Sequence, residues 1–171
     1  MKINNTQVQY LYNWLNAPLH GEQARARNKF TAIIEKQYLA SLDGRTDILK
    51  KFADKDKKTK EPVVENGLYK MSKAEDKDKA QKEVTKFLAK ETTYALTKNE
   101  KALVKTVIKI LNDAKIPLDI SNGKVYDSVM SELEAVKLLN WISDKKHLAI
   151  GVFCLAHKVL TLSIYMVYSV Q

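Results

Sequence analysis

The stretch that decides the fold runs from Glu22 to Asp56 and reads EQARARNKFTAIIEKQYLASLDGRTDILKKFADKD. Apolar residues recur in it three, four or seven positions apart, which is the spacing of one face of an α-helix. These residues are Phe30, Ile34, Tyr38, Leu42, Leu49 and Phe52. We therefore expect one long helix over residues 22–56. Gly44 interrupts the stripe at a cost of about 1 kcal/mol relative to Ala, which predicts a kink or a close contact with a neighbouring element.

The segment after this helix predicts a small β-hairpin, or an ordered loop, followed by a second helix. Two short apolar runs, residues 63–64 and 68–69, flank Asn66-Gly67. This dipeptide favours a type I′ turn because both of its residues tolerate positive φ. Residues 73–90 return to helical spacing, with a narrow apolar side made of Ala80, Val84, Phe87 and Leu88. Two helices joined through a polar tip form an αα-hairpin, which we expect to be an antiparallel coiled coil.

Shorter elements are expected on both sides of this hairpin. Residues 3–15 have helical spacing, and Asn5 or Thr6 could cap that helix. Residues 91–97, ETTYALT, are rich in Thr and Tyr and favour a short strand. A capping box, Thr97-Lys98-Asn99-Glu100, begins the next helix. A last amphipathic helix is expected to start near Asn122 and to bury Val125, Val129, Leu133, Val136 and Leu139.

These patterns predict a mainly α fold. Its parts are a long antiparallel helical hairpin with a small β-hairpin at its tip, additional helices, and an apolar C-terminal segment. The low content of turn residues, five Gly and three Pro in 171 residues, favours long helices over a β-rich architecture. The expected domain organisation is a helical domain over residues 1–146 and the apolar segment over residues 147–171.

The segment 147–171, HLAIGVFCLAHKVLTLSIYMVYSVQ, differs from the charged chain before it, since it holds no acidic residue and one lysine. Residues 148–170 are long enough to cross a bilayer as a helix. Lys158, near their middle, would cost about 2.5–3.5 kcal/mol on insertion. After Lys158, apolar residues alternate with Thr161, Ser163 and Tyr165, which favours a half-buried strand. Three interpretations stay open: core or subunit interface, membrane anchor, and an anomalous extension with no selected role.

The charge pattern argues against a specific nucleic-acid partner. The formal net charge is +9, but only three of the 29 basic residues are arginines, namely Arg25, Arg27 and Arg45. The guanidinium fork suits phosphate and base recognition better than the lysine ammonium does. The lysines also alternate with acidic residues, which weakens the field that a nucleic acid would feel.

No spacing of cysteine and histidine predicts a metal site or a disulfide. Cys154 is the single cysteine, so an intramolecular disulfide is excluded. It lies three residues before His157, but zinc needs a third and a fourth ligand. The other histidines, His20 and His147, are far apart in the sequence. The N-terminus lacks the apolar core of a signal peptide, and we expect synthesis in a reducing cytoplasm.

The remaining residues carry no catalytic or cofactor signature. The five glycines are too scattered to form a phosphate loop. The carboxylate pairs Asp76 and Asp78, and Glu132 and Glu134, lie in lysine-rich surroundings rather than in the desolvated sites that acid–base catalysis uses. The aromatic residues near the N-terminus, Tyr10, Tyr12 and Trp14, are expected in core packing and not in a stacking site. We therefore expect no enzyme, no catalytic or cofactor-binding residue, and no cofactor.

Three stretches carry a resemblance to a known family: RARNKFTAIIEKQYLASLDGRTDILKKFADKD, ENGLYKM and GKVYDSVMSELEAV. They resemble small phage proteins of unknown function that are encoded beside tail and baseplate genes in siphophages of Gram-positive bacteria. The family pattern has an MKI-N start, a long helix with an LLKKYA-KDE-like end, a polar linker and a late YD…LE helix. The corresponding ranges here are Met1–Asn4, Ile48–Asp56, Lys57–Met71 and Tyr126–Glu134. The resemblance covers about residues 1–137, and the C-terminal segment departs from it.

The resemblance implies no functional residue, because the family has no established activity. It favours a non-enzymatic phage structural or assembly protein that acts through protein–protein contacts, in the host bacterial cytoplasm or in the virion. The expected partner is a tail or baseplate component or a host protein, with a homo-oligomer as a further expectation. Two alternatives stay open: a small phage inhibitor that binds a host defence enzyme, and an accessory protein attached to a membrane through residues 148–170.

Overall fold

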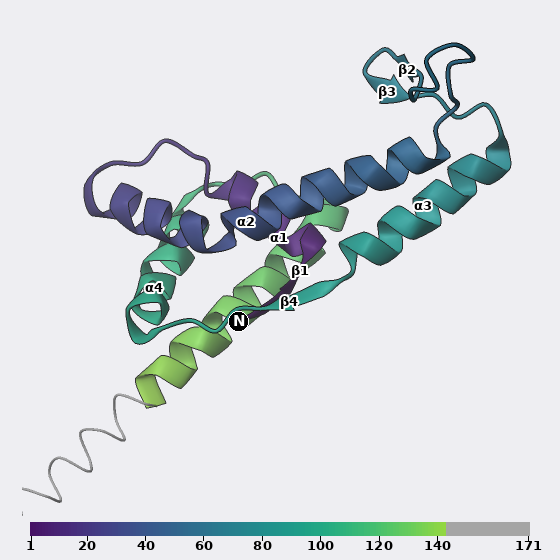
Figure 1. Cartoon of the computed structure of the whole chain (residues 1–171). Coiled ribbons are helices and arrows are strands. Elements are labelled where there is room, and N and C mark those ends of the chain that lie inside the picture. Colours follow the sequence, from purple (N-terminus) through teal and green to yellow (C-terminus); the bar gives the residue numbers. More distant parts are fainter. Residues whose placement is uncertain (143–171) are drawn as a thin grey trace, which may run out of the picture.

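The computed structural model describes residues 1–142, and its helices dominate the fold (Figure 1). The elements in chain order are β1 Lys2–Asn4, α1 Asn5–Trp14, α2 Gly21–Phe52, β2 Val64–Glu65, β3 Leu68–Tyr69, α3 Ala74–Leu88, β4 Glu91–Thr93 and α4 Lys98–Asp113. A further helix, residues 120–142, ends the described part. The prediction of a mainly α fold with small β elements is confirmed.

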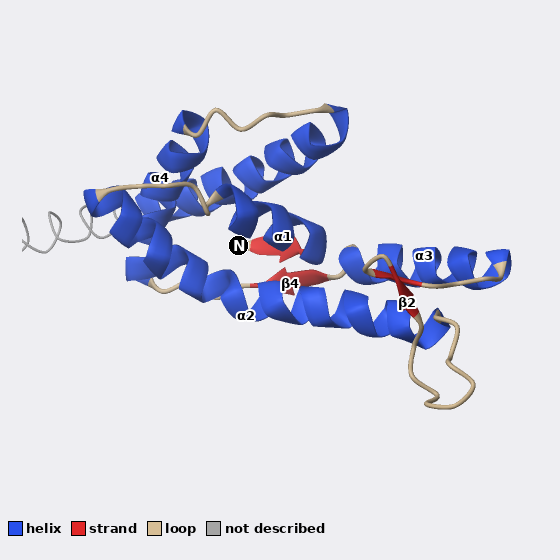
Figure 2. Cartoon of the chain, turned by 90° about the horizontal axis from the view of Figure 1, so that it is seen from above, coloured by secondary structure: helices blue, strands red, loops and turns tan. Residues whose placement is uncertain are grey.

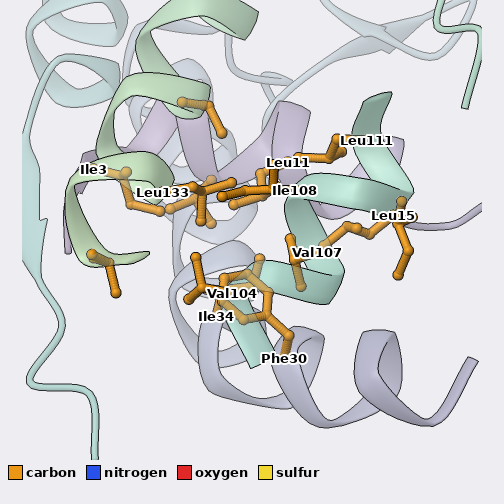
Figure 3. Close-up of a cluster of buried hydrophobic side chains, with 14 residues drawn as sticks. Ile3, Leu11, Leu15, Phe30, Ile34, Val104, Val107, Ile108, Leu111 and Leu133 are labelled. Carbon is orange, nitrogen blue, oxygen red and sulfur yellow. The ribbon is translucent and has the colours of Figure 1, made fainter. Parts of the chain in front are cut away.

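The hydrophobic core lies between β1, α1, the first half of α2, α4 and helix 120–142 (Figure 3). Its fully buried side chains include Ile3, Val8, Leu11, Leu15, Phe30, Ile34, Val104, Val107, Ile110, Leu111, Val129 and Leu133. The helical spacing in the sequence therefore identified most of the core-facing positions. Two expected core residues are exceptions: Leu42 in α2 and Leu139 in helix 120–142 are exposed.

The second half of α2 leaves this core and forms an arm together with α3. The two helices run in opposite directions, and β2 and β3 lie at the far end of the arm (Figures 1 and 2). α2 is 32 residues long and contacts both α3 and α4, so one helix belongs to the core and to the arm. α2 ends at Phe52, four residues before the predicted end at Asp56.

Two separate antiparallel pairs of strands complete the fold. β2 and β3 form the expected hairpin, in which Asn66 and Gly67 have positive φ values of 52° and 78°. The strand expected in residues 91–97 is confirmed as β4. Its partner β1 pairs Ile3 with Thr92, and this strand was not predicted from the sequence.

Two helix starts differ from the sequence prediction. Asn4, and not Asn5 or Thr6, caps α1, and it forms a capping box with Gln7. Helix 120–142 begins two residues earlier than expected, because the Asp119 carboxylate accepts hydrogen bonds from the backbone N–H groups of Ser121 and Asn122. The predicted Thr97–Glu100 capping box of α4 is confirmed.

The interpretations of the C-terminal segment fall on residues 147–171, which lie outside the described residues. The same holds for Cys154, His147 and His157, and for the predicted membrane span at residues 148–170. Within residues 1–142, no helix is both long enough and apolar enough to cross a membrane.

Candidate protein-interaction surfaces

The arm is held together by small residues of α2 that let α3 approach closely. Gly44 lies against the ring of Phe87, and a Cβ atom added at Gly44 would stand 2.8 Å from Cε2 of that ring. Ala80 and Val84 of α3 are buried nearby. Lys51 and Glu83 add an ion pair across the two helices, with Nζ and Oε1 3.0 Å apart. The close contact predicted at Gly44 is therefore present, and it explains why a glycine is used inside a helix.

Asn5 anchors the base of the arm to the core. Its side-chain Nδ2 donates to the Phe87 carbonyl at 2.9 Å, and its backbone N–H donates to the Lys90 carbonyl at 3.1 Å. Gln37 of α2 donates to Asn5 Oδ1. The last carbonyls of a helix have no partner within the helix, and Asn5 supplies a hydrogen-bond donor to one of them at the end of α3. The buried Asn5 side chain therefore joins α1, α2 and α3.

The tip of the arm, residues 53–72, is an ordered turn region and not a loose connection. The backbone carbonyl of Asp54 accepts a hydrogen bond from Val63 N–H, and the backbone N–H of Asp54 donates to the Lys70 carbonyl, both at 2.8 Å. The Asp54 carboxylate accepts from Ser72 N–H at 3.0 Å. The Asp56 carboxylate accepts from the backbone N–H groups of Lys58 and Thr59. These hydrogen bonds lower the pKa of Asp56, because they favour the charged carboxylate.

The tip presents apolar residues among lysines, and we call this the tip surface: Val64, Leu68, Lys55, Lys57, Lys58 and Lys60. Leu68 is 74% exposed and Val64 is 53% exposed, although both lie in regular strands. The four lysines are exposed as well. The carboxylates of Asp54 and Asp56 are occupied by hydrogen bonds to Ser72 N–H and to backbone N–H groups in the tip, and Glu65 pairs with Lys70 at 2.7 Å. Residues 53–72 hold five lysines and four carboxylates, so the tip surface combines exposed apolar side chains with exposed lysines at a formal charge of only +1 for the whole tip.

A second exposed apolar area lies where the described chain ends, and we call it the junction surface: Leu138, Leu139, Trp141 and Ile142. Leu138 and Trp141 line a groove of about 660 Å³ between α4 and helix 120–142. Ala102 and Ala135 also line it, and Lys101, Lys105 and Lys137 stand among its lining residues. Small alanine side chains on both helices leave the space in which this groove forms.

The residues that the sequence singled out for chemistry are not brought together. Within residues 1–142, no three of the groups that bind metals, His, Cys, Asp and Glu, gather into a site. His20 precedes α2 as its N-cap. Glu132 accepts a hydrogen bond from Lys2 N–H at 2.9 Å, so it fastens helix 120–142 to β1. Asp76 and Asp78 lie on α3, away from this contact.

The aromatic residues near the N-terminus pack against one another and against the core. Tyr12 stacks on Tyr38 with ring centroids 4.0 Å apart. Trp14 contacts Tyr10 at 5.3 Å and Tyr126 edge-on at 5.4 Å. Tyr12 and Trp14 are partly buried against the core cluster, as expected for packing residues. These rings join α1 to α2 and to helix 120–142.

Comparison with known proteins gives no match: no family model, no curated protein and no solved structure is similar to this chain at a significant level. The interaction surfaces therefore carry the functional argument. Sequence reasoning identified the hairpin of Leu68 but not its exposure. The run LLNWI, residues 138–142, carried a signal for the junction surface, because a helix apolar on several sides needs more than one neighbour.

Proposed function

We propose that this protein is a non-enzymatic phage structural or assembly protein that acts through protein–protein contacts made by its arm. The observation that carries the proposal is Leu68, a large apolar side chain exposed on a hairpin whose backbone is held by Asp54. Water-exposed apolar side chains on a fixed scaffold lose little conformational freedom when a partner covers them. The arm, which we predict to be an antiparallel coiled coil, carries this residue away from the core.

The chemistry of the tip surface defines the partner. Leu68 fits an apolar pocket, and carboxylates at the rim of that pocket would face Lys57, Lys58 and Lys60. Rim charges mainly set the association rate and its salt dependence, while the buried anchor sets the dissociation rate. Binding should therefore slow with added salt, and loss of Leu68 should accelerate dissociation.

Mass spectrometry of purified virions and of assembly intermediates tests the proposal in the phage that encodes this chain. The expected result is incorporation of the wild-type protein and loss of incorporation in Leu68→Ser. Leu118→Ser is the matched control, because Leu118 is an exposed leucine between α4 and helix 120–142, outside the tip surface. This variant should still bind the partner and be incorporated. Absence of the wild-type protein from both particles and intermediates would exclude a structural or assembly role.

The same tip surface supports a second candidate function, inhibition of a host enzyme by direct binding. The exposed lysines of the tip, together with its apolar anchor, also fit an enzyme cleft lined by carboxylates. Affinity purification from infected cells distinguishes the two functions. A host enzyme as the main partner, lost in Leu68→Ser and retained in Leu118→Ser, would favour inhibition; a tail or baseplate protein with the same pattern would favour assembly.

A further inference from the structure

Exposed apolar side chains concentrate at the end of the described chain. Ten large apolar residues are exposed within residues 1–142, and four of them are the junction surface. Leu138 and Leu139 are 57% and 62% exposed. At about 100° per residue, Leu138 lies on the side of the helix opposite the core residues Val129, Leu133 and Val136. Leu139 lies at the flank of the core face, three residues after Val136. A cluster of this kind marks a surface that another apolar element covers.

The groove beside this cluster has the shape for an apolar element. It lies between α4 and helix 120–142, with Ala102 and Ala135 among its lining residues, and it has a volume of about 660 Å³. Lysine side chains at its rim can lay their methylene stems along an apolar occupant and keep their ammonium groups in water. Glu134 also lines the groove, so its charged lining residues carry both signs. The part of the lining that suits an apolar occupant is made of Ala102, Ala135, Leu138 and Trp141.

The chain itself supplies such an occupant directly after the junction surface. Residues 148–170 are mostly apolar and carry no carboxylate side chain. The intervening residues 143–147, SDKKH, are polar, and connections of two to eight residues, roughly the usual range, join antiparallel helices in bundles. A tethered segment also has an effective concentration of about millimolar when the linker is short, which favours it over a separate molecule.

We propose that residues 148–170 pack back onto the junction surface and into the groove of the same chain. The position, length and composition of this segment support this packing, as do the exposed residues that precede it. It is independent of the function proposed for the arm. A second copy of the chain and a lipid bilayer are the competing occupants, and the experiment below distinguishes them.

Cys154 makes the test direct, because it is the single cysteine and lies within the proposed occupant. The rate of maleimide labelling is measured on the full-length protein without lipid, in buffer and in urea, with light scattering to establish the mass. We expect a monomer in which labelling is at least about tenfold slower than in urea, since a packed segment reacts only when it opens. Equal rates in buffer and urea would overturn the proposal.

Leu138→Asp tests whether the junction surface is the site that protects Cys154. Leu138 is exposed in the described residues, so the helix should keep its fold by circular dichroism while Cys154 labelling accelerates toward the urea rate. Leu68→Asp is the matched control at the tip of the arm and should leave the rate unchanged. An unchanged rate in Leu138→Asp would overturn the proposal. Protection found only in a dimer, or only with phosphatidylcholine vesicles, would also overturn it and would identify the second copy or the bilayer as occupant.

Discussion

Gly44 and Phe87 form the tightest contact between the two helices of the arm. A methyl group at Gly44 would overlap the Phe87 ring, and overpacking of this kind costs about 1–3 kcal/mol. Alanine also gains about 1 kcal/mol of helix propensity over glycine. We expect Gly44→Ala to lower the free energy of unfolding, because the overlap exceeds the gain in propensity. Urea denaturation of the variant measures the difference.

Gly123→Ala is the matched control, since nothing lies within 4 Å of a Cβ atom at that helical position. It should leave stability unchanged or raise it by up to about 1 kcal/mol. The double variant Gly44→Ala with Phe87→Leu should recover part of the loss, because the shorter side chain vacates the space. If Gly44→Ala proves as stable as Gly123→Ala, the close contact of Gly44 with Phe87 does not affect the free energy of unfolding.

Tyr94 carries a buried hydroxyl that has no hydrogen-bond partner among the described residues. Burial raises the pKa of this phenol to about 12, because the charged phenolate loses its solvation. An unpartnered buried hydroxyl costs about 1–3 kcal/mol. We expect Tyr94→Phe to raise the free energy of unfolding at pH 7, as measured by chemical denaturation. A decrease would show that the hydroxyl has a stabilising partner.

The same variant has a predicted effect at alkaline pH. The folded-state pKa of Tyr94 exceeds its ordinary value of 10, so the folded state binds more protons than the unfolded state between these values. The stability that this group contributes is complete below about pH 10 and is lost as the pH rises toward about 12. Tyr94→Phe should therefore lose stability less steeply than the wild type between about pH 10 and 12, while equal slopes would contradict the burial of this phenol.

The predictability of single residues depended on the sequence distance of their partners. The Thr97–Glu100 capping box could be predicted because both partners lie within one turn of helix. Asn5 was interpreted as a cap, but it bonds to carbonyls more than eighty residues away. A polar side chain near a helix start favours capping in any sequence, and only the folded chain shows that Asn4 has this role instead.

At the scale of elements, the start of α4 gives a pH prediction. Hydrogen bonds from the backbone and the side chain of Thr97 lower the pKa of Glu100 below its ordinary value of 4.5. The folded state then binds fewer protons than the unfolded state, so this stabilisation is complete above pH 4.5 and is lost as the pH falls through the lowered pKa. Glu100→Gln keeps the capping geometry and removes the charge.

We therefore expect Glu100→Gln to unfold less steeply with acid than the wild type between pH 5 and 2, in denaturation curves at several pH values. Thr97→Ala is the companion variant. It removes the cap itself and should cost about 1 kcal/mol at neutral pH. Identical acid slopes for the wild type and Glu100→Gln would show that the Glu100 carboxylate does not hold the start of α4.

Elements with strong local patterns were predicted well, and elements defined by distant pairing were not. The Asn66-Gly67 turn specifies its hairpin within four residues. The three residues of β1 have no strand pattern of their own, and their partner β4 begins 87 positions after β1 ends. The apolar stripe predicted the buried positions of α2 correctly through Ile34. Beyond Tyr38 the positions that face a neighbour are Ser41 and Gly44 instead of Leu42, because α3 approaches from another side.

At the scale of the whole molecule, stability should be uneven. Large buried side chains belong to the core, whereas the part of the arm beyond Gly44 buries only Ala53, Ala80 and Val84. Local opening is easiest where few apolar contacts are broken. In native-state hydrogen exchange, we expect residues 45–52 and 75–84 to exchange at a lower free energy than residues 104–111 of α4. A single free energy for both groups would show that arm and core unfold together.

The interaction surfaces were the least predictable feature, for a physical reason. A sequence pattern shows which side chains are apolar, but exposure depends on which neighbours reach them. Leu68 and Leu139 match the expected strand and helix patterns, yet no other described element covers either residue.

The pairing of β1 with β4 also determines when β1 can fold during synthesis on the ribosome, because its partner is made much later. Ile3 belongs to the same core as Val129 and Leu133, so β1 has to wait for helix 120–142, which is synthesised more than a hundred residues later. Synthesis at about 5–20 residues per second makes this a wait of many seconds. During that time the arm can close on itself, because its contacts are local, while α1 carries an uncovered apolar face. Among the described elements, β1 and α1 are therefore the ones that most need a chaperone during synthesis.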